Sequence, residues 1–191
     1  MQQYAAVQQH TLLSSFELYN LDQLLKQVEH VPGHLAEVGV YRGGTAKHLS
    51  KFASKQSREL HLFDTFEGMP PTDSTKDWHK QGDFADTSLD SVRELVQGDQ
   101  VTFHKGFFPA TATPIPQKTF SFVHIDVDIY QSVVDCCEFF YPRMTRGGIM
   151  LFDDYGRPTC PGAKRAVDEF FADKPEYRFY VHTGQCIIHK L

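Results

Sequence analysis

The sequence has no run of apolar residues long enough to cross a membrane. Hydrophobic residues make up 41% of the chain, but every apolar run is interrupted within about ten residues, far short of the ~20 that a membrane helix requires. The opening residues, MQQYAAVQQH, contain no Lys or Arg and no apolar core, so they do not predict a secretory signal. We therefore expect a cytoplasmic protein with no membrane partner.

Basic residues are also few. The 19 Lys and Arg residues are outnumbered by 24 Asp and Glu residues, which gives a formal net charge of −5. No basic block is present that could follow a phosphate backbone, so nucleic acid is not an expected partner. At 191 residues the chain has the size of one domain and can bury a core of its own.

Cysteine is scarce as well, with four residues in the chain. None of them forms a CxxC pair, and two are adjacent, Cys136 and Cys137, in a stretch that we expect to be helical. In an intracellular protein this pattern is typical of buried free thiols. The spacing therefore does not predict a zinc site.

Short β-type runs alternate with amphipathic stretches of helical length, which predicts an α/β fold with a mostly parallel sheet. The first helical stretch, Phe16 to Val31, has Leu at three- and four-residue spacing and is stopped by Pro32-Gly33. We expect it to cover the sheet or a partner subunit. Five strands are expected, beginning at His34, Glu59, Val101, Phe120 and Gly147.

The C-terminal part predicts an antiparallel addition to that sheet. A helix is expected around Ala163 to Phe171, followed by the strands YRFYVHT and QCIIHKL, which are separated only by a short glycine turn and must form a hairpin. The whole sheet would then have seven strands. We expect residues 1–33 to be a helical extension and residues 34–191 the main domain, with a lid over about residues 66–86, because structureless segments of that length are usually functional.

A glycine-rich turn follows the first expected strand, in the segment EVGVYRGG that begins at Glu37. Its GxxxGG spacing differs from the GxGxxG of dinucleotide folds, and the acid before the first glycine would lie poorly against a pyrophosphate. Asp64 ends the second strand about 20 residues later, where nucleotide folds place an acid on ribose hydroxyls. Together these features favour an adenosyl ligand with a positive charge. A tight turn that only packs a helix is the structural alternative.

Four aspartates lie at the C-terminal ends of the fourth and fifth expected strands. Asp126 and Asp128 are two residues apart, which in a pleated strand places both carboxylates on one face, and Asp153-Asp154 end the neighbouring strand. Like charges at one crevice repel each other unless a cation neutralises them or a proton is shared. We therefore predict a hard metal ion, Mg²⁺, with Mn²⁺ and Ca²⁺ as alternatives. Roles as helix caps or salt-bridge partners are the structural alternative.

Several motifs, in this order, resemble the macrocin-type O-methyltransferases of antibiotic biosynthesis: EVGVYRGG, FDTFEGMP, GDFADTS, GFFP, HIDVDIY, LFDDYG, AVDEFF and TGQ. The resemblance extends from Glu37 to Gln185. It implies the class I methyltransferase fold, S-adenosylmethionine and Mg²⁺ as cofactors, and methylation of a sugar hydroxyl or related alcohol in secondary metabolism. The expected partner is thus a small-molecule hydroxyl substrate. The apolar first helix would also suit the interface of a homodimer or higher homo-oligomer.

The resemblance also implies roles for individual residues. The metal ligands would be Asp126, Asp153 and Asp154. The cofactor contacts would be Glu37, Gly39, Gly43, Asp64, Phe84 and Asp86. Asp128 is the expected general base, because it would face the same way as Asp126, and His79 would fill that role if the lid closes over the site.

Three other functions remain as hypotheses. A nicotinamide-dependent oxidoreductase would require GxGxxG and has no use for four converging aspartates. A non-catalytic S-adenosylmethionine-binding protein would keep the cofactor pocket without the chemistry, as a lost acceptor site would allow. A methyltransferase that acts on a catechol or an amine would use the same metal-assisted deprotonation.

Overall fold

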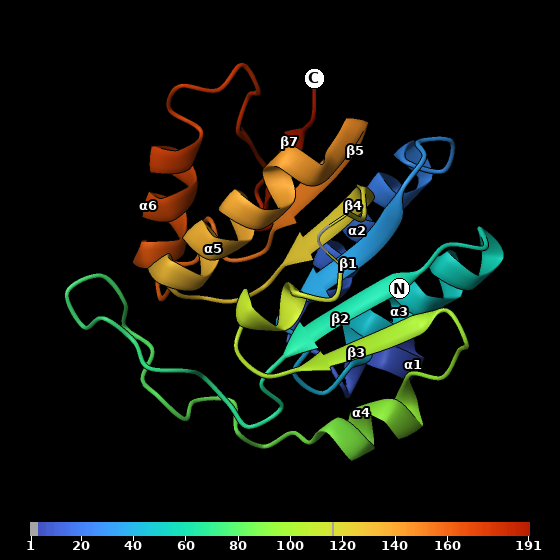
Figure 1. Ribbon diagram of the computed structural model, residues 1–191. Helices are drawn as coiled ribbons and strands as arrows, with labels where there is room; N and C mark the ends of the chain where they lie inside the picture. The colour runs from blue at the N-terminus through green and yellow to red at the C-terminus, as the bar shows by residue number, and fades with distance from the viewer. Residues whose placement is uncertain (1–3, 116) are drawn as a thin grey trace.

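The computed structural model describes residues 4–115 and 117–191 and shows one seven-stranded sheet with helices on both faces (Figure 1). The strands are β1 (His34–Val38), β2 (Leu60–Asp64), β3 (Val101–Lys105), β4 (Phe120–Ile125), β5 (Met144–Phe152), β6 (Phe179–Tyr180) and β7 (Cys186–His189). They are ordered β3-β2-β1-β4-β5-β7-β6. β1 to β5 pair in parallel, whereas β7 is antiparallel to both β5 and β6. The predicted fold, including its C-terminal antiparallel strands, is confirmed.

The helices form two layers because successive strand residues point to opposite faces of the sheet. They are α1 (Ala5–Gln8), α2 (Ser15–Gln27), α3 (Gly44–Lys55), α4 (Leu89–Leu95), α5 (Tyr130–Phe140) and α6 (Pro161–Phe170), with two short 3₁₀ helices at Ala110–Ala112 and Tyr141–Arg143. On one face, Val38 and Ile125 pack in a core with α5 and α6. On the other face, Leu35 and Leu62 pack in a core with α2 and α3.

The N-terminal segment lies on the sheet, as α2 was expected to do. A capping box starts this helix: Glu17 N–H donates to Ser14 Oγ at 3.3 Å, and Ser14 N–H donates to Glu17 Oε2 at 2.6 Å. Leu21, Leu24 and Leu25 enter the core that contains β1 and α3, whereas Leu18 packs in a small cluster with the N-terminal segment. The helix ends several residues before the expected stop at Pro32. The short helix α1 was not expected, because its few residues carry no periodic apolar pattern.

The strand ends differ from the prediction at one point that matters for the site. β4 ends at Ile125, so Asp126 and Asp128 lie beyond the pleated strand, and Asp128 has a positive φ of 60°. The prediction that both residues belong to the pleated strand was therefore wrong, although both line the same cavity. The turn after the strand, and not the pleat, decides where each carboxylate points.

The segment between β2 and α4, residues 65–88, is called the long segment below. All of its residues are described, and it contains no helix or strand (Figure 1, the green loop beside α5). Within it, Met69 N–H donates to the Asp83 carbonyl at 2.7 Å and Gly82 N–H donates to the Met69 carbonyl at 2.9 Å. These bonds draw the two ends of the segment together. Across residues 4–115 and 117–191, none of the helices is both long and apolar enough to span a bilayer.

Candidate active site

A cavity of about 290 Å³ opens where β1, β2, β4 and β5 end. β1 lies between β2 and β4 in the sheet, at the point where the strand order reverses, and open α/β sheets bind ligands at such a switch point. The predicted site residues that line the cavity are Gly39, Asp64, His79, Phe84, Asp126, Asp128, Asp153 and Asp154. Glu37, Gly43 and Asp86 do not line it.

Asp64 holds the glycine-rich turn in place. Its Oδ2 accepts hydrogen bonds from the backbone N–H groups of Val40 (2.7 Å) and Tyr41 (2.9 Å), and its Oδ1 accepts one from Phe66 N–H (2.6 Å). Tyr41 and Phe66 both have positive φ, at 51° and 54°. Such strained residues persist only where the surroundings over-determine them, and they concentrate at functional sites. The carboxylate is therefore rigidly placed at the cavity wall.

Gly39 lets the ends of β1 and β4 approach each other. Its φ is 87°, and a Cβ at this position would lie 1.7 Å from the carbonyl oxygen of Asp126. The Asp126 N–H in turn donates to the Val38 carbonyl at 2.9 Å. Residue 39 therefore has to be glycine. Because no side chain stands between them, Asp126 lies beside the glycine-rich turn.

The three predicted cofactor residues outside the cavity have other partners. The Glu37 side chain is buried beneath the cavity and pairs with His124. Gly43 is the left-handed N-cap of α3, and it faces the side chain of Val92. Asp86 is exposed and accepts a hydrogen bond from Tyr41 OH at 2.8 Å. Contact of these residues with a cofactor stays a prediction.

Three carboxylates form a tight cluster at the cavity floor. One oxygen from each of Asp126, Asp153 and Asp154 lies within 4.8 Å of the others. Because β5 ends at Phe152, the two consecutive aspartates leave the pleat and both reach the cavity. Burial, followed by repulsion from the neighbouring aspartates, raises the pKa of Asp126 and of Asp154 well above the usual range. The repulsion predicted from the sequence is therefore present.

Arg157 and His124, which both lie near Asp153, compensate part of the negative charge of this cluster. Gln185 Nε2 donates to Asp153 Oδ1 at 2.9 Å, and Arg157 lies 3.8 Å from Asp153 Oδ2. An oxygen-only donor set with excess negative charge is what a hard divalent cation such as Mg²⁺ prefers. The residues present therefore fit the expected metal.

His124 connects the cluster to Glu37. Its Nδ1 lies 2.9 Å from Glu37 Oε1 and its Nε2 lies 3.8 Å from Asp153 Oδ1. Burial alone would lower the pKa of His124, but the carboxylates of Asp153 and Glu37 outweigh it and raise the pKa well above its usual value. His124 is therefore a buried core histidine with a carboxylate on each side of its ring.

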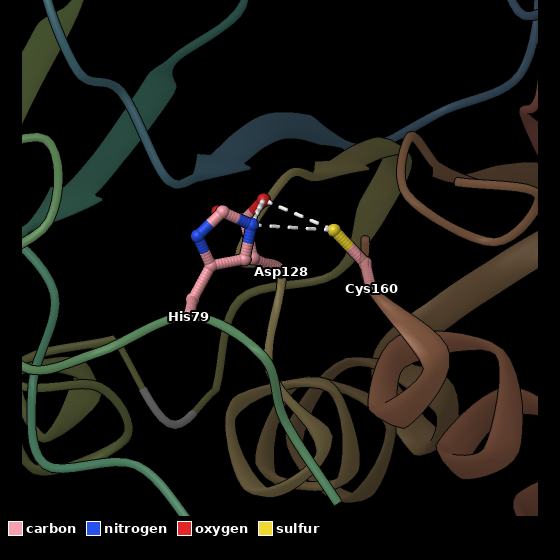
Figure 2. Close-up of side chains that lie close together, drawn as sticks. All are labelled: His79, Asp128 and Cys160. Atoms are coloured by element: carbon pink, nitrogen blue, oxygen red, sulfur yellow. Dashed lines mark hydrogen bonds and ion pairs between the residues drawn. The ribbon is translucent and has the colours of Figure 1, made fainter. Parts of the chain in front are cut away.

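Asp128 belongs to a second group of side chains, with His79 and Cys160 (Figure 2). His79 Nε2 lies 3.6 Å from Asp128 Oδ1, and Cys160 Sγ lies 3.4 Å from the same oxygen and 3.7 Å from His79 Nε2. Asp128 N–H donates to Asp154 Oδ2 at 2.9 Å, which joins this group to the carboxylate cluster. The four aspartates thus divide into two neighbouring groups. Cys160 was not among the predicted site residues.

Asp77 was also missed. It is 6% exposed, and its Oδ1 accepts a hydrogen bond from Tyr130 N–H at 2.8 Å, at the start of α5. A Cβ at Gly162 would lie 2.1 Å from the same oxygen, so α6 leaves room for this side chain. Asp77 therefore anchors the long segment to two helices. No local signal marks it, because the amide that it caps is 53 residues away.

Comparisons with known proteins show the family of the chain. The model of the family described as Macrocin-O-methyltransferase (TylF) matches residues 4–175. Demethyldecarbamoylnovobiocin O-methyltransferase of Streptomyces niveus is 30% identical over 180 residues, covering 85% of this chain and 68% of that protein. Mycinamicin III 3''-O-methyltransferase of Micromonospora griseorubida is 31% identical over 180 residues, covering 84% and 70%. The structure of the O-methyltransferase NovP matches with a TM-score of 0.85 and 28% identity, covering 95% of this chain and 82% of that one.

Proposed function

Because the chain belongs to the macrocin O-methyltransferase family, we propose that it methylates a sugar hydroxyl of a natural product with the help of a divalent metal ion. It is an S-adenosylmethionine-dependent O-methyltransferase that acts on a small-molecule hydroxyl. The observation that carries the metal part of the proposal is the convergence of Asp126, Asp153 and Asp154 on one cavity.

The cofactor binds at the turn between β1 and α3. Asp64 is already fixed there by three backbone N–H groups, and its remaining lone pairs can accept hydrogen bonds from ribose hydroxyls. Gly39 removes any side chain between this turn and Asp126. The nucleoside and the carboxylate cluster therefore share one cavity. Phe84, from the long segment, lines the same cavity and contributes apolar surface.

Asp126, Asp153 and Asp154 hold the metal ion. A divalent cation bound there supplies Lewis acidity toward a hydroxyl of the acceptor. Gln185 orients Asp153 through its 2.9 Å hydrogen bond, and the backbone N–H of Asp128 orients Asp154. Supporting contacts of this kind keep ligands in a fixed arrangement before the ion arrives.

Asp128 takes the proton from the acceptor hydroxyl. Burial raises the pKa of its carboxyl group above the usual value, which makes it a stronger base. His79 lies 3.6 Å from Asp128 Oδ1, and its other ring nitrogen lies 3.2 Å from Asp83 Oδ2. His79 is therefore placed next to the proposed base, where it is the alternative base if the segment closes over the site. Methyl transfer itself is an in-line displacement, for which the chain mainly positions the two reactants.

The experiment uses purified protein, S-adenosylmethionine and Mg²⁺ with a panel of glycosides, vicinal diols, catechols and amines. We expect O-methylation of a glycoside. Methylation of only catechols or amines would contradict the proposed acceptor. Cofactor binding without turnover of any acceptor would instead favour a binding protein.

The metal ligands are tested in the same assay with Asp126→Asn. This variant should retain cofactor binding and lose at least about 100-fold in kcat/KM, because a ligand has been removed from the ion. Asp99→Asn, which changes an exposed acid far from the cavity, is the matched control and should keep full activity. Normal turnover by Asp126→Asn would show that the ligand assignment is wrong.

A further inference from the structure

We propose that His79, Asp128 and Cys160 form a second metal site, which takes Zn²⁺ and lies next to the carboxylate cluster (Figure 2). The three side chains offer one nitrogen, one oxygen and one sulfur atom. They come from three distant parts of the chain: the long segment, the turn after β4 and the residue before α6. Figure 2 shows the three groups pointing toward one another.

The separations between the three donor atoms match a tetrahedral zinc site. Zn–N and Zn–O bonds of about 2.1 Å and a Zn–S bond of about 2.3 Å place N and O about 3.4 Å apart, and S about 3.6 Å from either. The structure has 3.6 Å between His79 Nε2 and Asp128 Oδ1, 3.7 Å from Cys160 Sγ to His79, and 3.4 Å from it to Asp128. Each distance agrees to within about 0.2 Å with the separation that the bond lengths imply.

The position of the group also suits a bound ion. All three residues line the cavity, so an ion can enter and its fourth coordination position faces the cavity. Cys160 is 3% exposed, and the side chains of His79 and Asp128 are 19% and 18% exposed. Asp83 Oδ2, at 3.2 Å from His79 Nδ1, fixes the orientation of the imidazole ring. Metal-bound histidines usually have a carboxylate partner of this kind.

The two neighbouring groups select different metals. The carboxylate cluster has only oxygen donors and suits a hard cation, whereas thiolate and imidazole favour Zn²⁺. When the metal–sulfur bond forms, the Cys160 thiol releases its proton to solvent. The weak hydrogen bond from the thiol to Asp128 Oδ1 is then replaced by two bonds to the ion.

Occupancy of this site would regulate the enzyme, a step that rests on the proposed function. Asp128 would bind the ion in place of the proton of the acceptor, and His79 would hold the long segment against the sheet. Zn²⁺ should therefore inhibit methyl transfer even when Mg²⁺ is in excess.

Binding is tested with Co²⁺ in place of Zn²⁺, in excess Mg²⁺. Co²⁺ bound by a thiolate gives a charge-transfer band in the near ultraviolet, and Co²⁺ bound by oxygen and nitrogen alone does not. We expect the band in the wild type and its loss when Zn²⁺ is added. Cys160→Ala should abolish it. Cys137→Ala, which removes a buried thiol from α5, is the matched control and should keep it.

His79→Gln, a change in the long segment outside the core, should weaken Co²⁺ binding at least tenfold. The proposal is overturned if the wild type gives no thiolate band, or if the band survives in Cys160→Ala. This readout needs no methyl acceptor, so its failure is distinct from a failure of the proposed function. Bound Zn²⁺ that leaves the rate of methyl transfer unchanged would overturn the inhibitory role.

Discussion

His124 and Glu37 are register partners on the adjacent strands β4 and β1, and their side chains are joined by a 2.9 Å contact in a fully buried position. Asp153, which lines the cavity, lies on the other side of the imidazole. The pair thus links the strand that leads into the glycine-rich turn to a predicted metal ligand. A buried charged pair is costly to break, because the remaining partner stays in the core without compensation.

Replacement of His124 by Leu should therefore destabilise the protein by about 3 kcal/mol, because it leaves the Glu37 carboxyl group buried alone. Urea denaturation gives the free energy of unfolding. The double variant with Glu37→Leu should recover much of this loss, since both polar groups are then gone. A double variant no more stable than His124→Leu would contradict this account of the pair.

Gly39→Ala should cost several kcal/mol, because its Cβ would lie 1.7 Å from the Asp126 carbonyl oxygen and backbone must move. The matched control is Gly82→Ala, which has a similar φ of 89° but nothing within 4 Å of the added Cβ. That change should cost only the left-handed strain, about 1 kcal/mol. Thermal unfolding compares the two variants. Equal losses would show that the close contact of β1 with the turn after β4 has no energetic importance.

Asp77→Ala should cost about 1 kcal/mol, because Tyr130 N–H at the start of α5 loses its acceptor. It should also release the long segment, so that limited proteolysis within residues 66–88 becomes faster. Ser74→Ala, in the same segment and exposed, is the control. If both variants are cleaved at the wild-type rate, Asp77 does not anchor the segment.

A buried histidine pair away from the cavity should contribute stability that is lost below pH 6.5. His61 Nδ1 lies 3.2 Å from His104 Nε2, and burial, with the neighbouring His104, lowers the pKa of His61 to about 4. Burial also lowers the pKa of His104. In the unfolded chain a histidine binds a proton near pH 6.5, but in the folded protein His61 binds it only near pH 4. The stabilisation is therefore complete above pH 6.5 and is lost as the pH falls toward 4.

His61→Gln should remove part of this pH dependence. Between pH 6.5 and 5, the free energy of unfolding of the variant should fall by roughly 1 kcal/mol less than that of the wild type. Urea titrations across this range measure the difference. His182→Gln, at an exposed position, should keep the wild-type slope. An unchanged slope in His61→Gln would mean that this histidine does not cause the acid sensitivity.

The fold could be predicted from the sequence because its signals are local. The runs that become β1, β2 and β3 are short, rich in β-branched, aromatic or other apolar residues, and bounded by glycine or aspartate. The spacing of the leucines marks α2. The carboxylate cluster could also be predicted, since parallel strands present their carboxyl ends to one edge of the sheet. Asp126, Asp153 and Asp154 accordingly meet at the cavity.

The rest of the site depends on contacts that no short motif encodes. Asp128 is placed by a positive φ after the strand, and sequence alone did not require that conformation. Cys160 is 32 residues from Asp128 and 81 from His79, so a search for closely spaced cysteines and histidines cannot find the group. Asp77 and Tyr130 meet across a similar distance in the chain. Tertiary packing, and not local propensity, positions all of these side chains.

The central claim is that a divalent ion on Asp126, Asp153 and Asp154 is required for methyl transfer. The most direct test is the rate of methyl transfer by the wild-type protein after complete removal of metal with EDTA, followed by titration of free Mg²⁺. We predict that the rate falls to background in EDTA and rises to saturation with Mg²⁺, while S-adenosylmethionine still binds the metal-free protein. An undiminished rate in EDTA would contradict the claim.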